Sequence, residues 1–222
     1  MPSFGPQYCE TPDIVSAFPA ELWNTWSNLV IIAFGLAATY LVWKHARRAY
    51  DLWTLSVLLI ANGIGSLLWH GLRTSEALVF DTTPGILFLM LFVYLWARRF
   101  YGWVGAAVIF VAFLVLQYVS AVSMSTLFPG LPFFAGVAVP VVLLGLLLAY
   151  KGSFISGRSA LFGILALVFA LSALLFRSID AWACEYLPMG THFLWHALLS
   201  CGAFLGILAL RAVDYEKGKG TP

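Results

Sequence analysis

Seven stretches of mostly apolar residues follow one another along the chain, and each is long enough to cross a lipid bilayer. A helix needs about 20 residues to span the hydrocarbon core. By that measure the sequence predicts membrane spans at approximately 22–43, 52–72, 81–97, 102–121, 132–150, 159–178 and 189–211. Backbone polar groups in lipid must be satisfied internally, so spans of this kind fold as helices. We therefore predict an all-α integral membrane protein built as a seven-transmembrane helix bundle.

The composition agrees with a membrane protein and excludes several other classes. Hydrophobic residues make up 62% of the chain and charged residues only 10%, whereas soluble domains are about a quarter charged. The formal net charge is +2, and no run of basic residues occurs with interleaved aromatic residues. A protein that binds nucleic acid would carry a basic patch of that kind. We therefore expect a lipid bilayer around this chain and no nucleic-acid partner.

The basic residues predict how the bundle is oriented. Ten of the 12 Lys and Arg residues follow the odd-numbered spans, namely Lys44, Arg47, Arg48, Arg98, Arg99, Lys151, Arg158, Arg211, Lys217 and Lys219. The other two, Arg73 and Arg177, lie toward the opposite side. Because cytoplasmic segments are enriched in basic residues, the C-terminus is predicted to be cytoplasmic. Residues 1–21 then form a polar segment on the outer or lumenal side, 22–211 the transmembrane domain, and 212–222 a cytoplasmic tail.

The N-terminal segment has neither the basic region nor the apolar core of a signal peptide, so we expect it to remain in the mature protein. The predicted orientation places Cys9 and Cys184 on the same outer side, where disulfides persist. The two are either bonded, which would tie the N-terminal segment to the mouth of the bundle, or are separate thiols. Cys201 lies inside the last span and is expected to pack as a small apolar residue.

Five polar side chains occur where lipid-facing residues are expected. His192 and His196 lie one helical turn apart and share a face of the last span. Ser66 and His70 repeat this spacing at the end of the second span, and Asp81 opens the third. Spans two and three meet on the outer side, where span seven begins, so these groups share one membrane depth. Polar residues at such depth indicate function.

The chemistry of these residues favours a hydrolytic metal site. Three neutral imidazoles leave one coordination position open on zinc, as in hydrolases that bind zinc through three histidines. We therefore predict that His70, His192 and His196 bind Zn²⁺. Asp81 is the candidate general base or orienting carboxylate, and Ser66 could bond the water or a developing oxyanion. Taken singly, each histidine would be interpreted as a side chain at the membrane–water interface. Only the common depth of the three favours a metal site.

The same residues resemble the signature of the alkaline ceramidase family. The signature consists of Ser66-x3-His70, Asp81 and His192-x3-His196, preceded by YCE and AELWNTWSNL near the N-terminus. This family belongs to a superfamily of seven-helix membrane hydrolases that includes the adiponectin/progestin receptors and Per1-type proteins. The resemblance extends over nearly the whole chain.

The resemblance implies a zinc-dependent amidase that cleaves ceramide into a sphingoid base and a fatty acid. The three histidines would hold the zinc, and Ser66 and Asp81 would complete the catalytic site. It also implies a disulfide between Cys9 and Cys184. The orientation with the N-terminus outside matches the ceramidases and is opposite to that of the adiponectin receptors.

The resemblance further implies a calcium site in the N-terminal segment, but with departures. Glu10 and Glu21 match the family, whereas Gln7 stands where an aspartate is expected and Pro12 replaces an asparagine. Asp13 could compensate. Calcium prefers six to eight oxygen ligands, several of them carboxylates. The alternative is that Glu10 and Glu21 cap or anchor the first span.

Other functions fit the sequence less well. A lipid receptor or sensor with a structural zinc would use four protein ligands, and a fourth histidine at the right depth is missing. A transporter or channel is disfavoured because the polar groups gather at one end. A hydrolase of another lipid amide or ester is the nearer alternative. Both a bacterial plasma membrane and a eukaryotic ER or Golgi membrane fit these features.

Overall fold

The computed structural model describes residues 4–127 and 134–219, and every long regular element there is a helix. They are α1 (Leu22–His45), α2 (Tyr50–Leu72), α3 (Ser75–Leu127), α4 (Phe134–Ser153), α5 (Gly157–Ala183) and α6 (His192–Lys219). Within the described residues, six helices are long and apolar enough to cross a membrane. The protein is therefore an all-α, multi-pass integral membrane protein. The expected start of the fifth span, at 132–133, lies outside the described residues.

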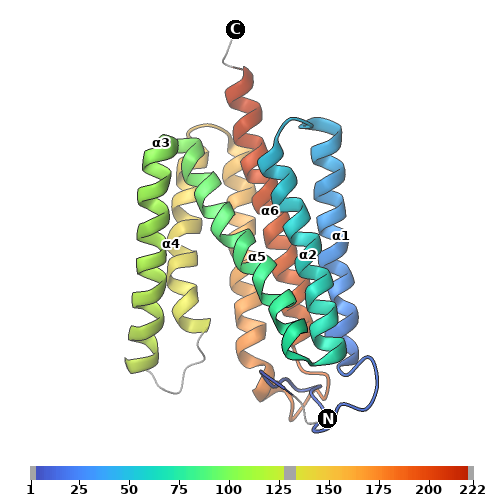
Figure 1. Cartoon of the computed structure of the whole chain (residues 1–222). Helices are drawn as coiled ribbons and strands as arrows, with labels where there is room; N and C mark the ends of the chain where they lie inside the picture. Colours follow the sequence, from blue (N-terminus) through green and yellow to red (C-terminus); the bar gives the residue numbers. More distant parts are fainter. Residues whose placement is uncertain (1–3, 128–133, 220–222) are drawn as a thin grey trace.

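The longest helix, α3, contains both the third and the fourth predicted spans. At about 1.5 Å per residue a straight helix of this length would measure roughly 80 Å, far more than a bilayer. Gly102 interrupts it with non-helical angles (φ 67°, ψ −171°), and the chain reverses direction there, so that α3 forms two antiparallel arms (Figure 1). Residues other than glycine adopt such a positive φ only at a cost.

Two helix boundaries differ from the predicted ones. α3 begins at Ser75 and not at residue 81, which puts Asp81 inside the helix instead of at its opening. α6 continues to Lys219, so most of the expected cytoplasmic tail, 212–222, is helical. Both differences have one cause, because the length of an apolar stretch predicts the membrane-embedded part of a helix and not its polar ends.

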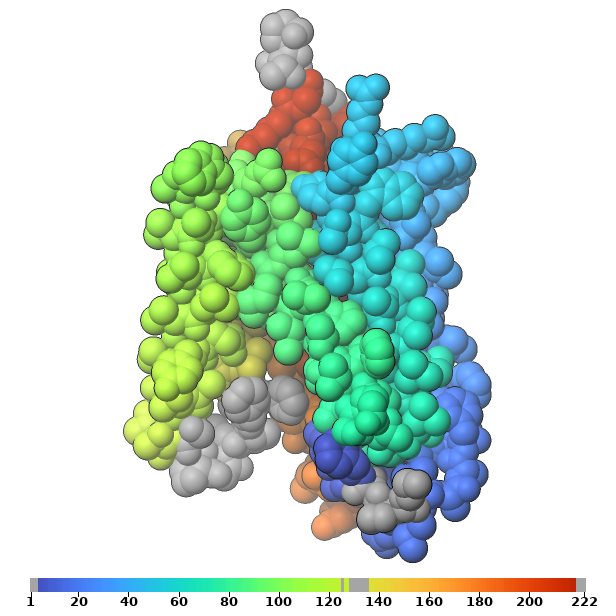
Figure 2. Space-filling model, in the orientation of Figure 1, coloured from blue at the N-terminus to red at the C-terminus, as the bar shows by residue number. Residues whose placement is uncertain are grey.

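Successive helices pack beside one another, and α1 also packs against α6. The N-terminal segment lies at one end of the bundle, together with the α2–α3 and α5–α6 connections, and the C-terminus lies at the other (Figure 1). In the described part of the chain, α3 and α5 make little or no direct contact. The face in view in Figure 2 is hollowed toward the N-terminal end, between the two arms of α3.

The two ends of the bundle have different interiors. Toward the C-terminal end the buried core is apolar and includes Leu52, Leu55, Trp96 and Leu210. Toward the N-terminal end the buried side chains are largely polar, and they include Glu21, Asn24, Thr25, Asn28, Ser66, His70, Arg73, Asp180, Thr191, His192 and His196. Burying polar groups costs free energy unless they are bonded. Their concentration at one end therefore marks the candidate site.

Candidate metal centre

Three histidines from two helices meet at the polar end of the bundle. His70 lies in the last turn of α2, His192 is the first residue of α6, and His196 follows one turn later. Their exposed fractions are 1%, 3% and 2%. One nitrogen from each ring lies within 4.8 Å of the other two, so the group could hold a metal ion. This confirms the prediction that these histidines come together.

Glu21, immediately before α1, orients the His70 ring. Its Oε2 lies 2.5 Å from His70 Nδ1. A carboxylate only accepts, so Nδ1 carries the proton and Nε2 keeps its lone pair for a metal. Glu21 also accepts hydrogen bonds from Thr11 at 2.5 Å and Asn24 at 3.0 Å, and its Oε1 lies 3.1 Å from the Arg73 guanidinium. Burial raises the pKa of Glu21, while the Thr11 hydroxyl and the Arg73 charge act in the opposite direction.

Ser27 in α1 has the same relation to His196. The Ser27 hydroxyl donates to the main-chain oxygen of Asn24 at 3.0 Å, and its oxygen lies 2.7 Å from His196 Nδ1. Because the hydroxyl hydrogen goes to the carbonyl, the serine oxygen accepts from Nδ1, and Nε2 of His196 keeps its lone pair. Ser27 thus fixes the tautomer of His196, as Glu21 fixes that of His70. Partners of metal-binding histidines commonly have this role.

The third ring differs, because buried Nδ1 of His192 has no hydrogen-bond partner among the described residues. A buried ring nitrogen without a partner is unfavourable, and a metal ion would remove that cost. Three imidazoles, two with their tautomers held by neighbours and one with an unpaired nitrogen, form a donor set compatible with zinc. The residues present therefore fit the metal that the sequence predicts.

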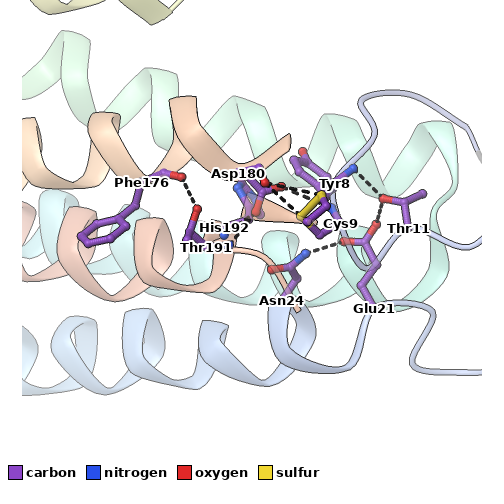
Figure 3. Close-up of a disulfide and its surroundings, with 10 residues drawn as sticks. Tyr8, Cys9, Thr11, Glu21, Asn24, Phe176, Asp180, Thr191 and His192 are labelled. Carbon is purple, nitrogen blue, oxygen red and sulfur yellow. Dashed lines mark hydrogen bonds between the residues drawn. A yellow bond between two sulfur atoms is a disulfide. The ribbon is translucent and has the colours of Figure 1, made fainter. Parts of the chain in front are cut away.

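Asp180 in α5 fixes the beginning of α6. Its Oδ1 accepts the backbone N–H groups of Thr191 at 2.7 Å and His192 at 2.9 Å (Figure 3). Its Oδ2 accepts the backbone N–H of Cys9 at 3.3 Å, and Cys9 is joined to Cys184 by a disulfide. One carboxylate therefore holds both the helix that carries two of the histidines and the N-terminal segment that lies across it.

Tyr8 covers the histidines on the side of the N-terminal segment. Its ring stacks on His192, with 4.0 Å between centroids and 18° between planes, and lies 5.1 Å from the ring of His70. The guanidinium groups of Arg73 and Arg177 lie 5.4 Å and 4.4 Å from the Tyr8 ring. Burial raises the pKa of the Tyr8 phenol. The segment held by the disulfide therefore closes this end of the site against water.

Ser66 and Asp81 bring a hydroxyl and a carboxylate together where α2 meets α3. Ser66 is buried one turn before His70, and its hydroxyl interacts with the Asp81 carboxylate. α2 and α3 can approach closely here because residue 65 is glycine, and a side chain at this position would collide with the main chain of Phe80 and Asp81. Asn62 Nδ2 donates to the Asp81 main-chain oxygen at 2.7 Å. A carboxylate, a hydroxyl and three imidazoles that could hold a metal ion are the kinds of group that metal-assisted hydrolysis uses.

The residues of the predicted calcium site are not gathered around a common point in this arrangement. Glu10 accepts the backbone N–H groups of Trp23 at 2.9 Å and Asn24 at 2.7 Å, and so anchors the start of α1. Burial raises the pKa of Glu10 despite these hydrogen bonds. Asp13 is exposed, and both oxygens of Glu21 are taken up by the partners described above. The structure gives calcium no support, so the calcium site stays a prediction.

Sequence reasoning missed four residues of this site, namely Glu21 as the partner of His70, Ser27, Tyr8 and Asp180. One signal was available. Glu21, Asn24 and Asn28 recur at helical spacing along an otherwise apolar span, and all three are fully buried. Such a polar stripe predicts a helix face turned toward polar partners.

A family model described as Ceramidase matches residues 5–221, which is nearly the whole chain. Among curated proteins, none matches the sequence significantly.

Proposed function

Because the chain belongs to the ceramidase family, we propose that it is a zinc-dependent amidase that hydrolyses ceramide to a sphingoid base and a free fatty acid. The observation that carries the proposal is the group of three buried histidines, two of whose Nδ1 atoms are held by Glu21 and Ser27. That arrangement leaves the opposite nitrogens of His70 and His196 available to a metal.

The proposed topology has seven membrane crossings, because each arm of α3 would cross once. The N-terminal segment then faces the outside or the lumen and the C-terminus faces the cytoplasm. The distribution of Lys and Arg supports this, since ten of the 12 lie after spans that end toward the C-terminal side of the bundle. The site would lie toward the outer or lumenal face of a bacterial plasma membrane or a eukaryotic ER or Golgi membrane.

The proposed roles divide the reaction among the residues of the site. His70, His192 and His196 would hold a zinc ion, which would supply a bound water molecule of near-neutral pKa and a Lewis acid for the carbonyl group. Glu21 and Ser27 hold His70 and His196 in the tautomers that such an ion requires. Asp81 accepts a proton as the water oxygen bonds to the amide carbon. Ser66 donates a hydrogen bond to the carbonyl oxygen as negative charge develops there.

The second half of the reaction returns the proton. When the carbon–nitrogen bond breaks, protonated Asp81 gives its proton to the departing nitrogen, which leaves as the amine of the sphingoid base. The water has then supplied the oxygen of the fatty acid and the proton of the amine. General acid–base catalysis of this kind raises the reaction rate about 10²–10⁴-fold.

The substrate would enter from the bilayer between α3 and α5. These helices make little or no contact, and Figure 2 shows the hollow on the same side of the bundle. The acyl and sphingoid chains would stay among apolar residues while the amide reaches Asp81 and the histidines. Tyr8 and the disulfide-bonded segment close the polar end, which keeps bulk water from the reacting groups.

Release of sphingoid base from ceramide by purified protein in mild detergent tests the proposal. Wild type should release the base, and His196→Ala should not. Ser200→Ala is the matched control, because Ser200 is buried one turn further along α6 and bonds only the Ala197 carbonyl. If the wild type binds zinc and releases nothing from ceramide, the substrate assignment is wrong, and other lipid amides and esters become the candidates.

A further inference from the structure

A second pocket lies at the end of the bundle away from the histidines, between α1, α5 and α6. Its volume is about 560 Å³. Leu41, Phe162 and Leu208 line its apolar wall, and Arg158 and Arg211 stand among its polar lining residues. The pocket is therefore amphipathic, with cationic and apolar surfaces side by side, and none of its lining residues belongs to the metal centre.

The polar side of this pocket includes the N-terminus of α5. Ser156 precedes the helix with extended backbone angles, but its side chain does not cap the helix. Ser156 is only 9% exposed and lines the pocket. A side chain built at Gly157 would touch nothing within 4 Å, so the first turn of the helix is open. Free N–H groups at a helix start, with a serine hydroxyl beside them, suit an anion.

The charges of the pocket point the same way. Neither Arg158 nor Arg211 forms an ion pair in the described part of the chain, and Glu216 is the single acidic residue in the lining. Guanidinium groups and helix N-termini together recognise phosphate oxygens. The apolar wall beside them suits an acyl chain. A phospholipid would therefore fill the pocket better than a free phosphate ion, which has no acyl chain. Basic pockets between transmembrane helices bind anionic headgroups in this way.

We propose that this pocket binds an anionic glycerophospholipid, with its phosphate between Arg158, Arg211 and the start of α5. The lipid's acyl chains lie along the apolar wall formed by Leu41 and Phe162. The site is separate from the metal centre and does not depend on the ceramidase reaction.

Thermal unfolding of the purified protein in detergent, with increasing dioctanoylphosphatidylglycerol, measures this binding, because a ligand of the folded state raises the unfolding temperature. Wild type should show a saturable rise. The double variant Arg158→Gln/Arg211→Gln should need about thirtyfold more lipid, since each basic residue near an anionic lipid is worth about fivefold in affinity. Arg48→Gln, an exposed basic residue at the same end but outside the pocket lining, should respond like wild type.

A second variant covers the case in which the double variant does not fold. Gly157→Asp has space for its side chain and puts a carboxylate at a helix start, where it favours folding. It should still lose the response to the lipid, because its charge repels the phosphate. An unchanged response in either folded variant overturns the proposal, as does the lack of any response in wild type. An equal rise with dioctanoylphosphatidylcholine or with inorganic phosphate also overturns it, since apolar binding or a simple ion site would then suffice.

Discussion

Replacing Glu21 by glutamine tests how the metal centre is assembled. Three groups share hydrogen bonds with the Glu21 carboxylate, Thr11 at Oε1 and Asn24 and His70 at Oε2, and the Arg73 guanidinium forms an ion pair with Oε1. A glutamine has the same shape but one oxygen and one NH₂ group. Whichever way the amide turns, its NH₂ group faces donors. If it faces His70, Nδ1 cannot keep its proton, and the proton moves to the nitrogen that would bind the metal.

Two magnitudes follow for Glu21→Gln. Loss of the group that orients a metal-binding histidine weakens metal binding by about 10–100-fold, which is about 1.4–2.7 kcal/mol. Glu21 and Arg73 are almost fully buried, and removing one charge of a buried pair costs about 3–5 kcal/mol of folding free energy. The loss of the group that orients His70 lowers the affinity for zinc. The loss of the buried charge pair lowers the stability of the metal-free protein.

Competition between the purified protein and a fluorescent zinc chelator measures the affinity, and denaturant unfolding of the metal-free protein measures the stability. Glu10→Gln is the matched control, because Glu10 also lies beside the start of α1 but bonds backbone N–H groups there and no histidine. Its zinc affinity should equal that of wild type. A folded Glu21→Gln variant with wild-type zinc affinity would refute the assigned orientation of His70.

Three further outcomes are expected. Asp81→Asn should keep its zinc, and its kcat for ceramide should fall by a factor of about 10²–10⁴. Sphingoid base release and bound metal are measured on the same sample, and a folded variant with full turnover would exclude Asp81 as the base. Ser27→Ala frees Nδ1 of His196 and should lower zinc affinity at least about tenfold in the chelator competition, and an unchanged affinity would contradict that contact. Cys9→Ser/Cys184→Ser should lose about 2–5 kcal/mol of stability. Dithiothreitol should lower wild type to the same level and leave the variant unchanged, whereas a reductant-insensitive wild type would contradict a stabilising disulfide.

The parts of the fold that depend on local pattern were predictable from sequence. Apolar length marked the membrane helices, and the position of the break in α3 was predicted to within a few residues of Gly102. The spacing of His192 and His196 required a shared face once the segment was known to be helical. Their meeting with His70 followed from the order of the spans, because the end of span two and the start of span seven fall on the same side.

The parts that depend on contacts between distant segments were not predictable. Tyr8 stacks on His192 across most of the length of the chain, and Asp180 joins Cys9 to the start of α6. No periodicity encodes such contacts, which depend on the path of an irregular N-terminal segment. For the same reason Glu21 was assigned to calcium from its place in a motif, whereas the structure surrounds it with hydrogen-bond donors and a guanidinium group.

The central claim is that His70, His192 and His196 hold one zinc ion that ceramide hydrolysis requires. The direct test is to strip the purified protein with a chelator, return zinc in measured amounts, and record bound metal and sphingoid base release together. Activity should disappear with the metal and return in full when one zinc ion is bound per chain. Full ceramide hydrolysis by protein without bound metal would contradict the claim.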